Sequence, residues 1–133
     1  MYLENSDSDR ILNIHDIRVA TDTAGAVVIV RRNPILGTVG ANNAHTPVNL
    51  NFQSDILASG IFHNWDETGT AGITGLTGGT ILESHVLRGS NTVFLYESAV
   101  ILFQGNSLSI VVFNGTGGNI EISGTIRFHY EEI

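Results

Sequence analysis

The sequence predicts an all-β protein, a two-sheet antiparallel β-sandwich with jelly-roll topology and about eight strands. Apolar and polar residues alternate in several segments, such as Val48–Gln53 and Ile120–Glu131, and this period of two is typical of half-buried strands. Gly, Asn, Asp and Ser separate these segments, and no stretch sustains the 3.6-residue period of an amphipathic helix. An immunoglobulin-like sandwich is the alternative architecture.

The first two expected strands are Ile11–Ala20 and Ala26–Arg32. In Ile11–Ala20 the apolar residues change parity at His15-Asp16. This switch predicts a β-bulge, or a strand that crosses from one sheet to the other. Thr21–Gly25 supplies the turn, and the β-branched residues of Ala26–Arg32 favour a strand that is buried in its middle.

The middle of the chain is the least regular part. Asn33–Pro47 is a polar stretch rich in turn-forming residues. Val48–Gln53 alternates as a strand, and Ile56–Phe62 is expected to form a further strand or a sheet edge. His63–Gly79 is rich in glycine and is expected to be a loop or a long excursion.

Apolar segments return in the last third of the chain. Thr80–Arg88 alternates again, and Thr92–Tyr96 and Ala99–Phe103 are two further apolar runs that are expected to be separate strands. Gly105-Asn106 is a strong turn signal.

The chain closes with an expected hairpin. Leu108–Phe113 would pair, through a turn at Asn114–Asn119, with a long strand from Ile120 to Glu131. Val111 and Phe113 lie on the parity opposite to the apolar face that would fill the core, so they are candidate interface residues. The predicted core residues of this hairpin are Leu108, Ile110, Val112, Ile120, Ile122, Ile126 and Phe128.

Length and composition favour one β-sandwich domain over residues 11–133, preceded by a flexible, acidic N-terminal arm over residues 1–10. Tyr2 and Leu3 of this arm are candidate contacts with a neighbouring subunit. The start of the chain lacks the basic and apolar regions of a signal peptide, and no run is long enough for a membrane helix.

The charge balance disfavours two classes of partner. The net charge is −7, the six cations are all arginines, and only Arg31-Arg32 forms a pair. Binding to nucleic acid, or to an anionic membrane surface, needs several cations on one face. Neither partner is therefore expected.

Residues with catalytic or metal-binding chemistry are scattered. There is no cysteine, and none of the five histidines lies at ligand spacing from another. No nucleophile elbow and no phosphate-binding loop is present, since the glycines at Gly115–Gly118 lack a following helix and lysine. The sequence predicts no catalytic residues, no metal site and no cofactor, and a protein that is not an enzyme.

The densest cluster of functional residue types is His63-Asn64-Trp65-Asp66-Glu67. Trp65 is the single tryptophan and could stack on a sugar or anchor a partner, and the acids Asp66 and Glu67 would supply hydrogen bonds. His63 is the remaining candidate of this loop. The alternative is a loop whose Trp65 covers the edge of the core. A calcium site at Asp66 and Glu67 has suitable oxygen ligands but lacks the spacing of a calcium loop.

Taken in order, six segments resemble those of a family of small virion proteins of tailed phages, the trimeric capsid decoration (cement) proteins. They are Ile11–Val19, Asn33-Pro34, Thr46–Asn51, Gly69–Gly79, Val100–Leu108 and Phe128–Glu131. The resemblance covers most of the chain from Ile11 onward and consists of strand and turn residues rather than catalytic ones.

The resemblance implies a jelly-roll protein on the capsid surface of the virion. It would form a homotrimer that binds the major capsid protein and stabilises the head. The alternative is a receptor- or glycan-binding head domain of a phage fibre or tail, which would use the Trp65 loop.

Overall fold

The protein is built from antiparallel strands. A computed structural model describes residues 1–38, 46–47, 58, 60–63, 74–89, 92–115 and 117–133. The strands are β1 (Tyr2–Asn5), β2 (Arg10–Thr21), β3 (Ala24–Arg32), β4 (Ile35–Thr38), β5 (Gly60–His63), β6 (Thr74–Thr77), β7 (Thr80–Arg88), β8 (Thr92–Leu102), β9 (Ser107–Phe113) and β10 (Ile122–Glu132). No helix occurs in these ranges, so none there could span a membrane.

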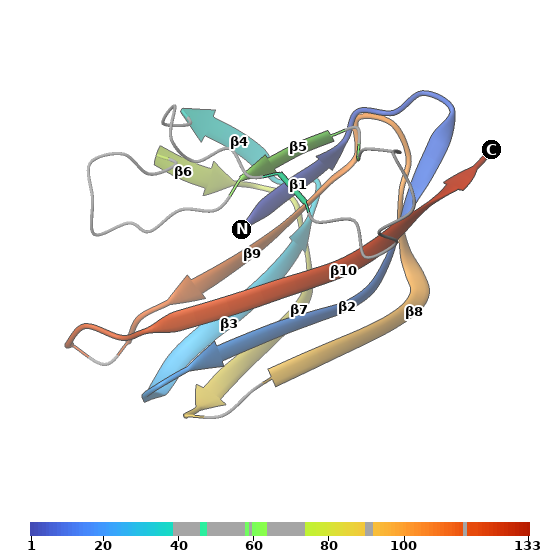
Figure 1. Ribbon diagram of the computed structural model, residues 1–133. Helices are drawn as coiled ribbons and strands as arrows, with labels where there is room; N and C mark the ends of the chain where they lie inside the picture. Colours follow the sequence, from blue (N-terminus) through green and yellow to red (C-terminus); the bar gives the residue numbers. More distant parts are fainter. Residues whose placement is uncertain (39–45, 48–57, 59, 64–73, 90–91, 116) are drawn as a thin grey trace.

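The strands form three sheets (Figure 1). The largest has the order β5-β1-β9-β3-β7, the second has the order β10-β2-β8, and β4 pairs with β6. Four of the pairs are nested along the chain: β1 with β9, β2 with β8, β3 with β7 and β4 with β6. The described part of the chain is therefore a long hairpin folded over on itself, with β10 added outside β2.

One hydrophobic core joins the two larger sheets. It contains side chains from β1, β3, β7 and β9 of the five-stranded sheet and from β2 and β8 of the three-stranded sheet. Its fully buried large side chains are Leu3, Leu12, Ile14, Ile17, Val19, Val28, Val30, Leu87, Leu102 and Leu108. Burial of such side chains stabilises each sheet against the other by about 1.5–3 kcal/mol per residue.

The bulge expected in the first long strand is confirmed. In β2 the register shifts between Ile14 and Asp16 relative to β8, and the pairing with β10 shifts between Arg127 and Phe128. Relative to β10, His15 is the extra residue, and its side chain is exposed. One inserted residue returns the following apolar side chains to the core face, which explains the parity switch in the sequence.

The terminal hairpin prediction is wrong. β9 pairs with β1 and β3, whereas β10 pairs with β2 in the other sheet. The segment after Phe113 therefore crosses between sheets instead of turning back beside β9. Alternation shows which face of a strand is buried, but it does not show which strand lies beside it.

The predicted core of these two strands is mostly correct. Leu108 and Ile110 are buried. Val112, Ile120, Ile126 and Phe128 are partly buried and pack against the core. Ile122 is 49% exposed and does not belong to it, because it lies at the first position of β10.

The expected flexible arm is also corrected. Tyr2–Asn5 form β1, which lies between β5 and β9, and Leu3 belongs to the core. The Met1 amine donates to the Ile110 carbonyl oxygen over 2.8 Å, and the Ile110 amide donates back to the Met1 carbonyl oxygen over 2.8 Å. Only four residues of an otherwise polar and acidic segment enter the sheet, which is too short a pattern to identify from sequence.

Three further strand boundaries differ from expectation. The runs Thr92–Tyr96 and Ala99–Phe103 belong to the single strand β8, in which Glu97 adopts a positive φ of 43°. β4 lies within the stretch expected to be turns, and β6 lies within the region expected to be a loop. The strand expected at residues 48–53 lies outside the described residues. Of residues 56–62, the described part includes the β5 residues 60–62.

Candidate functional site: an exposed apolar sheet face

The outer surface of the five-stranded sheet carries apolar side chains. Val28 and Val30 of β3 point into the core, as do Leu108 and Ile110 of β9. Successive side chains of a strand point to opposite faces, so the residues between them point away from the core. The outer apolar face, as we define it, consists of Val27, Ile29, Ile81, Val86, Val111 and Phe113.

Strand register places these residues in adjacent rows across β7, β3 and β9. Val86, Val27 and Phe113 lie opposite one another in one row, and Ile29 and Val111 are partners in the next. Cross-strand partners lie close enough for their side chains to be in contact. The five residues of these two rows therefore form a continuous surface, and Ile81 lies in the following row as the partner of Arg31.

Much of this surface is open to solvent. Val86 is 62% exposed and Phe113 is 51% exposed, and Ile81 is exposed as well. Val27, Ile29 and Val111 between them are half-buried. Single exposed apolar residues are common on proteins, but a contiguous set across three strands is typical of a binding surface.

The charges near the outer apolar face are few. Ser84 and Ser109 complete its rows, and Arg31, the partner of Ile81, is the one charged residue within them. The Arg31 guanidinium donates to the Gly78 carbonyl oxygen over 3.3 Å. No carboxylate lies in these rows, although the chain has thirteen acidic residues.

Sequence reasoning placed two of its four interface candidates on this surface. Val111 and Phe113 lie on the outer apolar face, as their parity predicted. Tyr2 and Leu3 do not offer an exposed contact, because both are buried in β1. The Tyr2 hydroxyl donates to Glu4 over 2.7 Å, and burial is the main cause that raises the pKa of Tyr2 to about 12.

The predicted partner or glycan loop is mostly outside the described residues. His63 is the last residue of β5, and its backbone lies opposite Tyr2. Trp65, Asp66 and Glu67 fall in the range 64–73, which the structure does not describe. The role assigned to this loop therefore stays a prediction.

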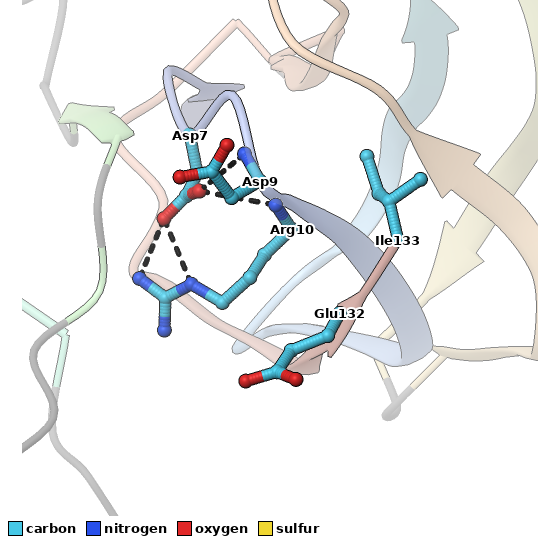
Figure 2. Close-up of a pocket in the computed structure, with 5 residues that line it drawn as sticks. All are labelled: Asp7, Asp9, Arg10, Glu132 and Ile133. Carbon is cyan, nitrogen blue, oxygen red and sulfur yellow. Dashed lines mark hydrogen bonds and ion pairs between the residues drawn. The ribbon is translucent and has the colours of Figure 1, made fainter.

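A shallow pocket lies where the β1–β2 connection meets the end of β10 (Figure 2). Its volume is about 510 Å³, and Asp7, Asp9, Arg10, Glu132 and Ile133 line it. The Arg10 guanidinium is turned toward Asp7, whose carboxylate it contacts at 2.6 Å. This pairing holds the pKa of Asp7 below its ordinary value. The pocket's cation is thus already paired within the protein.

The outer face of the three-stranded sheet is polar at its centre. Asp16 of β2 is buried beneath the guanidinium of Arg127 from β10, at 2.5 Å, and lies 3.4 Å from the Arg18 guanidinium. The hydrogen bond from Arg127 lowers the pKa of Asp16, and desolvation opposes this shift. The carboxylate is therefore held ionised across two strands.

Sequence reasoning missed one cluster on that same face. The rings of His15 and His129 are stacked with centroids 4.6 Å apart, although the sequence suggested isolated histidines. The two residues are 114 positions apart, and only the pairing of β2 with β10 brings them together. Within the described ranges, no three His, Cys, Asp or Glu side chains converge as a set of metal ligands.

Comparison of the chain with protein-family models, curated proteins and solved structures found no match. What the molecule does has therefore to be inferred from its own fold and surface.

Proposed function

We propose that this protein is a structural virion protein, a capsid decoration protein that forms homotrimers and stabilises the head by binding the major capsid protein. The observation that carries the proposal is the outer apolar face. A protein that exposes a contiguous apolar surface on regular strands presents a rigid, preformed area to a partner. The resemblance of the sequence to phage decoration proteins agrees with this.

The strand connections support the jelly-roll topology that belongs to this proposal. A jelly roll arises when a long hairpin folds over, so that its first strand pairs with its last and inner strands pair in turn. The nested pairs from β1–β9 to β4–β6 follow this rule. Two sheets that share one core, with the order β1-β9-β3-β7 in one of them, are consistent with a sandwich of this kind. Viral capsid proteins are among the proteins that use jelly rolls, but lectins and cupins use them too, so the fold alone does not select the function.

Charge favours a second copy of the chain as one partner of the outer apolar face. Copies with a net charge of −7 repel one another at most orientations. The rows of the outer apolar face contain no carboxylate and one arginine, so this face of each copy meets the next copy of a trimer with the least repulsion. Contact between copies would also remove Phe113 and Val86 from water, and each buried Å² of apolar surface contributes about 25 cal/mol.

The oligomeric state tests the first half of the proposal. Sedimentation equilibrium over a wide concentration range should give a trimer for the natural chain. Phe113→Ser should weaken the trimer, because it removes a large, exposed apolar side chain from the outer apolar face. Phe103→Ser is the matched control, since Phe103 is 53% exposed but lies after β8 in the other sheet. A strictly monomeric natural chain, or equal effects of the two variants, would contradict the proposal.

Binding to capsids tests the second half. Phage heads that lack a decoration protein should retain the added protein after sedimentation and should then resist a higher temperature. The Phe113→Ser variant, if it no longer forms trimers, should bind the heads more weakly because trimerisation multiplies the contacts. Absence of cosedimentation with any head preparation that displays free decoration sites would rule out this role.

A further inference from the structure

The His15–His129 pair joins two strands on the outer face of the three-stranded sheet. Nδ1 of His129 lies 2.6 Å from Nε2 of His15, and the rings stack at an interplanar angle of 29°. Both side chains are exposed. His15 is the bulge residue of β2, so the irregularity that restores the core pattern also turns this imidazole toward β10.

Hydrogen bonding around the pair fixes which nitrogens carry protons. The Asn13 side-chain amide lies 3.5 Å from Nε2 of His129 and donates to the Glu131 carboxylate over 3.1 Å. An amide N–H can only donate, so Nε2 of His129 is the acceptor and its Nδ1 carries the proton. That proton is donated to Nε2 of His15. Nδ1 of His129 and Nε2 of His15 therefore face one another at the surface. Each can offer a lone pair to an ion once the proton on Nδ1 has moved away.

We propose that the His15–His129 pair binds a first-row divalent transition metal, of which Cu²⁺ and Ni²⁺ are the best matches and Zn²⁺ the next. Imidazole nitrogen is a preferred ligand of all three metals. The ion would replace the proton between the two nitrogens, with water in its other coordination positions. This inference does not depend on the proposed function, because the pair lies on the other sheet from the outer apolar face.

The geometry needs only a small change to admit the ion. Metal–nitrogen bonds are about 2.0–2.1 Å long, so two imidazoles bound side by side have their nitrogens about 3 Å apart. The present separation of 2.6 Å must widen by a few tenths of an ångström. Exposed rings can open by this amount through χ rotation, while the strand pairing on either side keeps their backbones in place.

Neighbouring groups suit a cation at this position. Arg127, the nearest guanidinium along β10, is paired with Asp16 and so offers little repulsion. Glu131 lies on the same face two residues after His129 and shares the Asn13 amide with it. Once the metal takes Nδ1 of His129, the ring proton moves to Nε2. The Glu131 carboxylate can accept a hydrogen bond from Nε2–H, as carboxylates beside metal-bound histidines commonly do.

Titration calorimetry at mildly alkaline pH tests the site with Cu²⁺ and Ni²⁺ on the untagged 133-residue chain, free of any purification histidines. We expect one ion per chain and no net release of a proton, because the His129 ring proton moves from Nδ1 to Nε2 instead of leaving the protein. His15→Ala and His129→Ala should each weaken binding by at least about tenfold, since even the loss of a group that orients a ligand weakens metal affinity by about 10–100-fold. Glu131→Gln should weaken binding less than either.

His85→Ala is the matched control, because His85 is an exposed histidine on β7 and lies outside the pair. Its affinity should equal that of the natural chain. Paramagnetic Cu²⁺ should broaden the imidazole resonances of His15 and His129 before those of other histidines, and far-ultraviolet circular dichroism should show that each variant is folded. Equal affinity in folded His15→Ala, a stoichiometry of one ion per two chains, or selective broadening of His85 would each overturn the proposal.

Discussion

The side-chain amide of Asn5 donates to the carbonyl oxygen of Leu102 over 2.8 Å, although the residues are 97 positions apart. The same amide donates to the Arg10 carbonyl oxygen over 2.9 Å. The Asn5 backbone adds two bonds to the β8–β9 turn, accepting from the Gly105 amide and donating to the Asn106 carbonyl oxygen. One fully buried asparagine thus joins the β1–β2 connection to the β8–β9 turn.

Replacement of this asparagine should be strongly destabilising. Asn5→Ala leaves the buried carbonyl oxygen of Leu102 and the partly buried carbonyl oxygen of Arg10 without their donor, and each buried group that loses its partner costs about 1–3 kcal/mol. We expect a loss of about 2–4 kcal/mol in the free energy of unfolding, measured by urea denaturation. Asn119→Ala, at an exposed position, should stay within about 0.5 kcal/mol of the natural chain. Similar losses in the free energy of unfolding of both variants would show that the buried amide of Asn5 contributes no more to stability than an exposed amide does.

Acidification should destabilise the 133-residue chain through Met1. Burial lowers the pKa of its amine from 8.0 to about 5 in the folded state. The unfolded chain therefore binds a proton between about pH 8 and pH 5 that the folded chain does not. The contribution of this amine to the free energy of unfolding is therefore most favourable above pH 8. It decreases as the pH falls from about 8 to about 5, by on the order of 1 kcal/mol per pH unit.

Comparison of urea denaturation at several pH values between the natural chain and an N-terminally acetylated chain isolates this effect. The acetylated chain has no amine to titrate, so its stability should depend less steeply on pH, whatever its absolute value. Identical slopes, or an amine that titrates near pH 8 in the folded protein by NMR, would refute the prediction.

Two glycines with the same backbone conformation should respond differently to alanine. Gly79 and Gly105 both have a φ of +75°, where a side chain is strained. A Cβ at Gly79 would lie 2.7 Å from the Arg32 carbonyl oxygen, whereas a Cβ at Gly105 would meet nothing within 4 Å. Gly105→Ala should cost about 1–2 kcal/mol from backbone strain alone. Gly79→Ala should lower the urea midpoint further, and a smaller loss at Gly79 would contradict the packing described here.

Removal of the buried hydroxyl of Tyr2 and removal of that of Tyr96 should affect the stability of the protein differently. Burial raises the pKa of Tyr2 and of Tyr96 to about 12. The Tyr2 hydroxyl donates to Glu4, but the Tyr96 hydroxyl has no hydrogen-bond partner in the described part of the chain. Tyr2→Phe should therefore cost about 1 kcal/mol, and Tyr96→Phe should be neutral or stabilising in thermal unfolding. Destabilisation by Tyr96→Phe would indicate a partner such as an ordered water.

The parts of the fold that sequence reasoning found are those set by local alternation. The change of parity at His15-Asp16 is a direct consequence of the residue that β2 inserts relative to β10, so the bulge was predictable. The same reasoning placed Val111 and Phe113 on the surface opposite the core. Each of these depends on the geometry of a single strand.

The parts that were missed depend on which strands are neighbours. β9 and β10 follow one another in the chain, and a hairpin satisfies their alternation as well as the observed arrangement in two sheets does. The contact between His15 and His129 follows only once β2 is known to pair with β10. Long-range pairing is decided by the packing of the whole core, which no short segment encodes.

The nested pairing has a consequence for how the protein folds. β1 cannot occupy its place in the five-stranded sheet until β9 exists, and the paired residues Leu3 and Leu108 are separated by most of the chain. Such non-local pairing requires a large loss of chain entropy before the stabilising contacts form. Folding should therefore be slow. During synthesis, β2 stays unpaired until β8 and β10 emerge in the last third of the chain, and before then β1 and β3 have only β5 and β7 as partners. A cell that makes this protein in large amounts therefore carries, for that interval, a population of exposed strands prone to join one another.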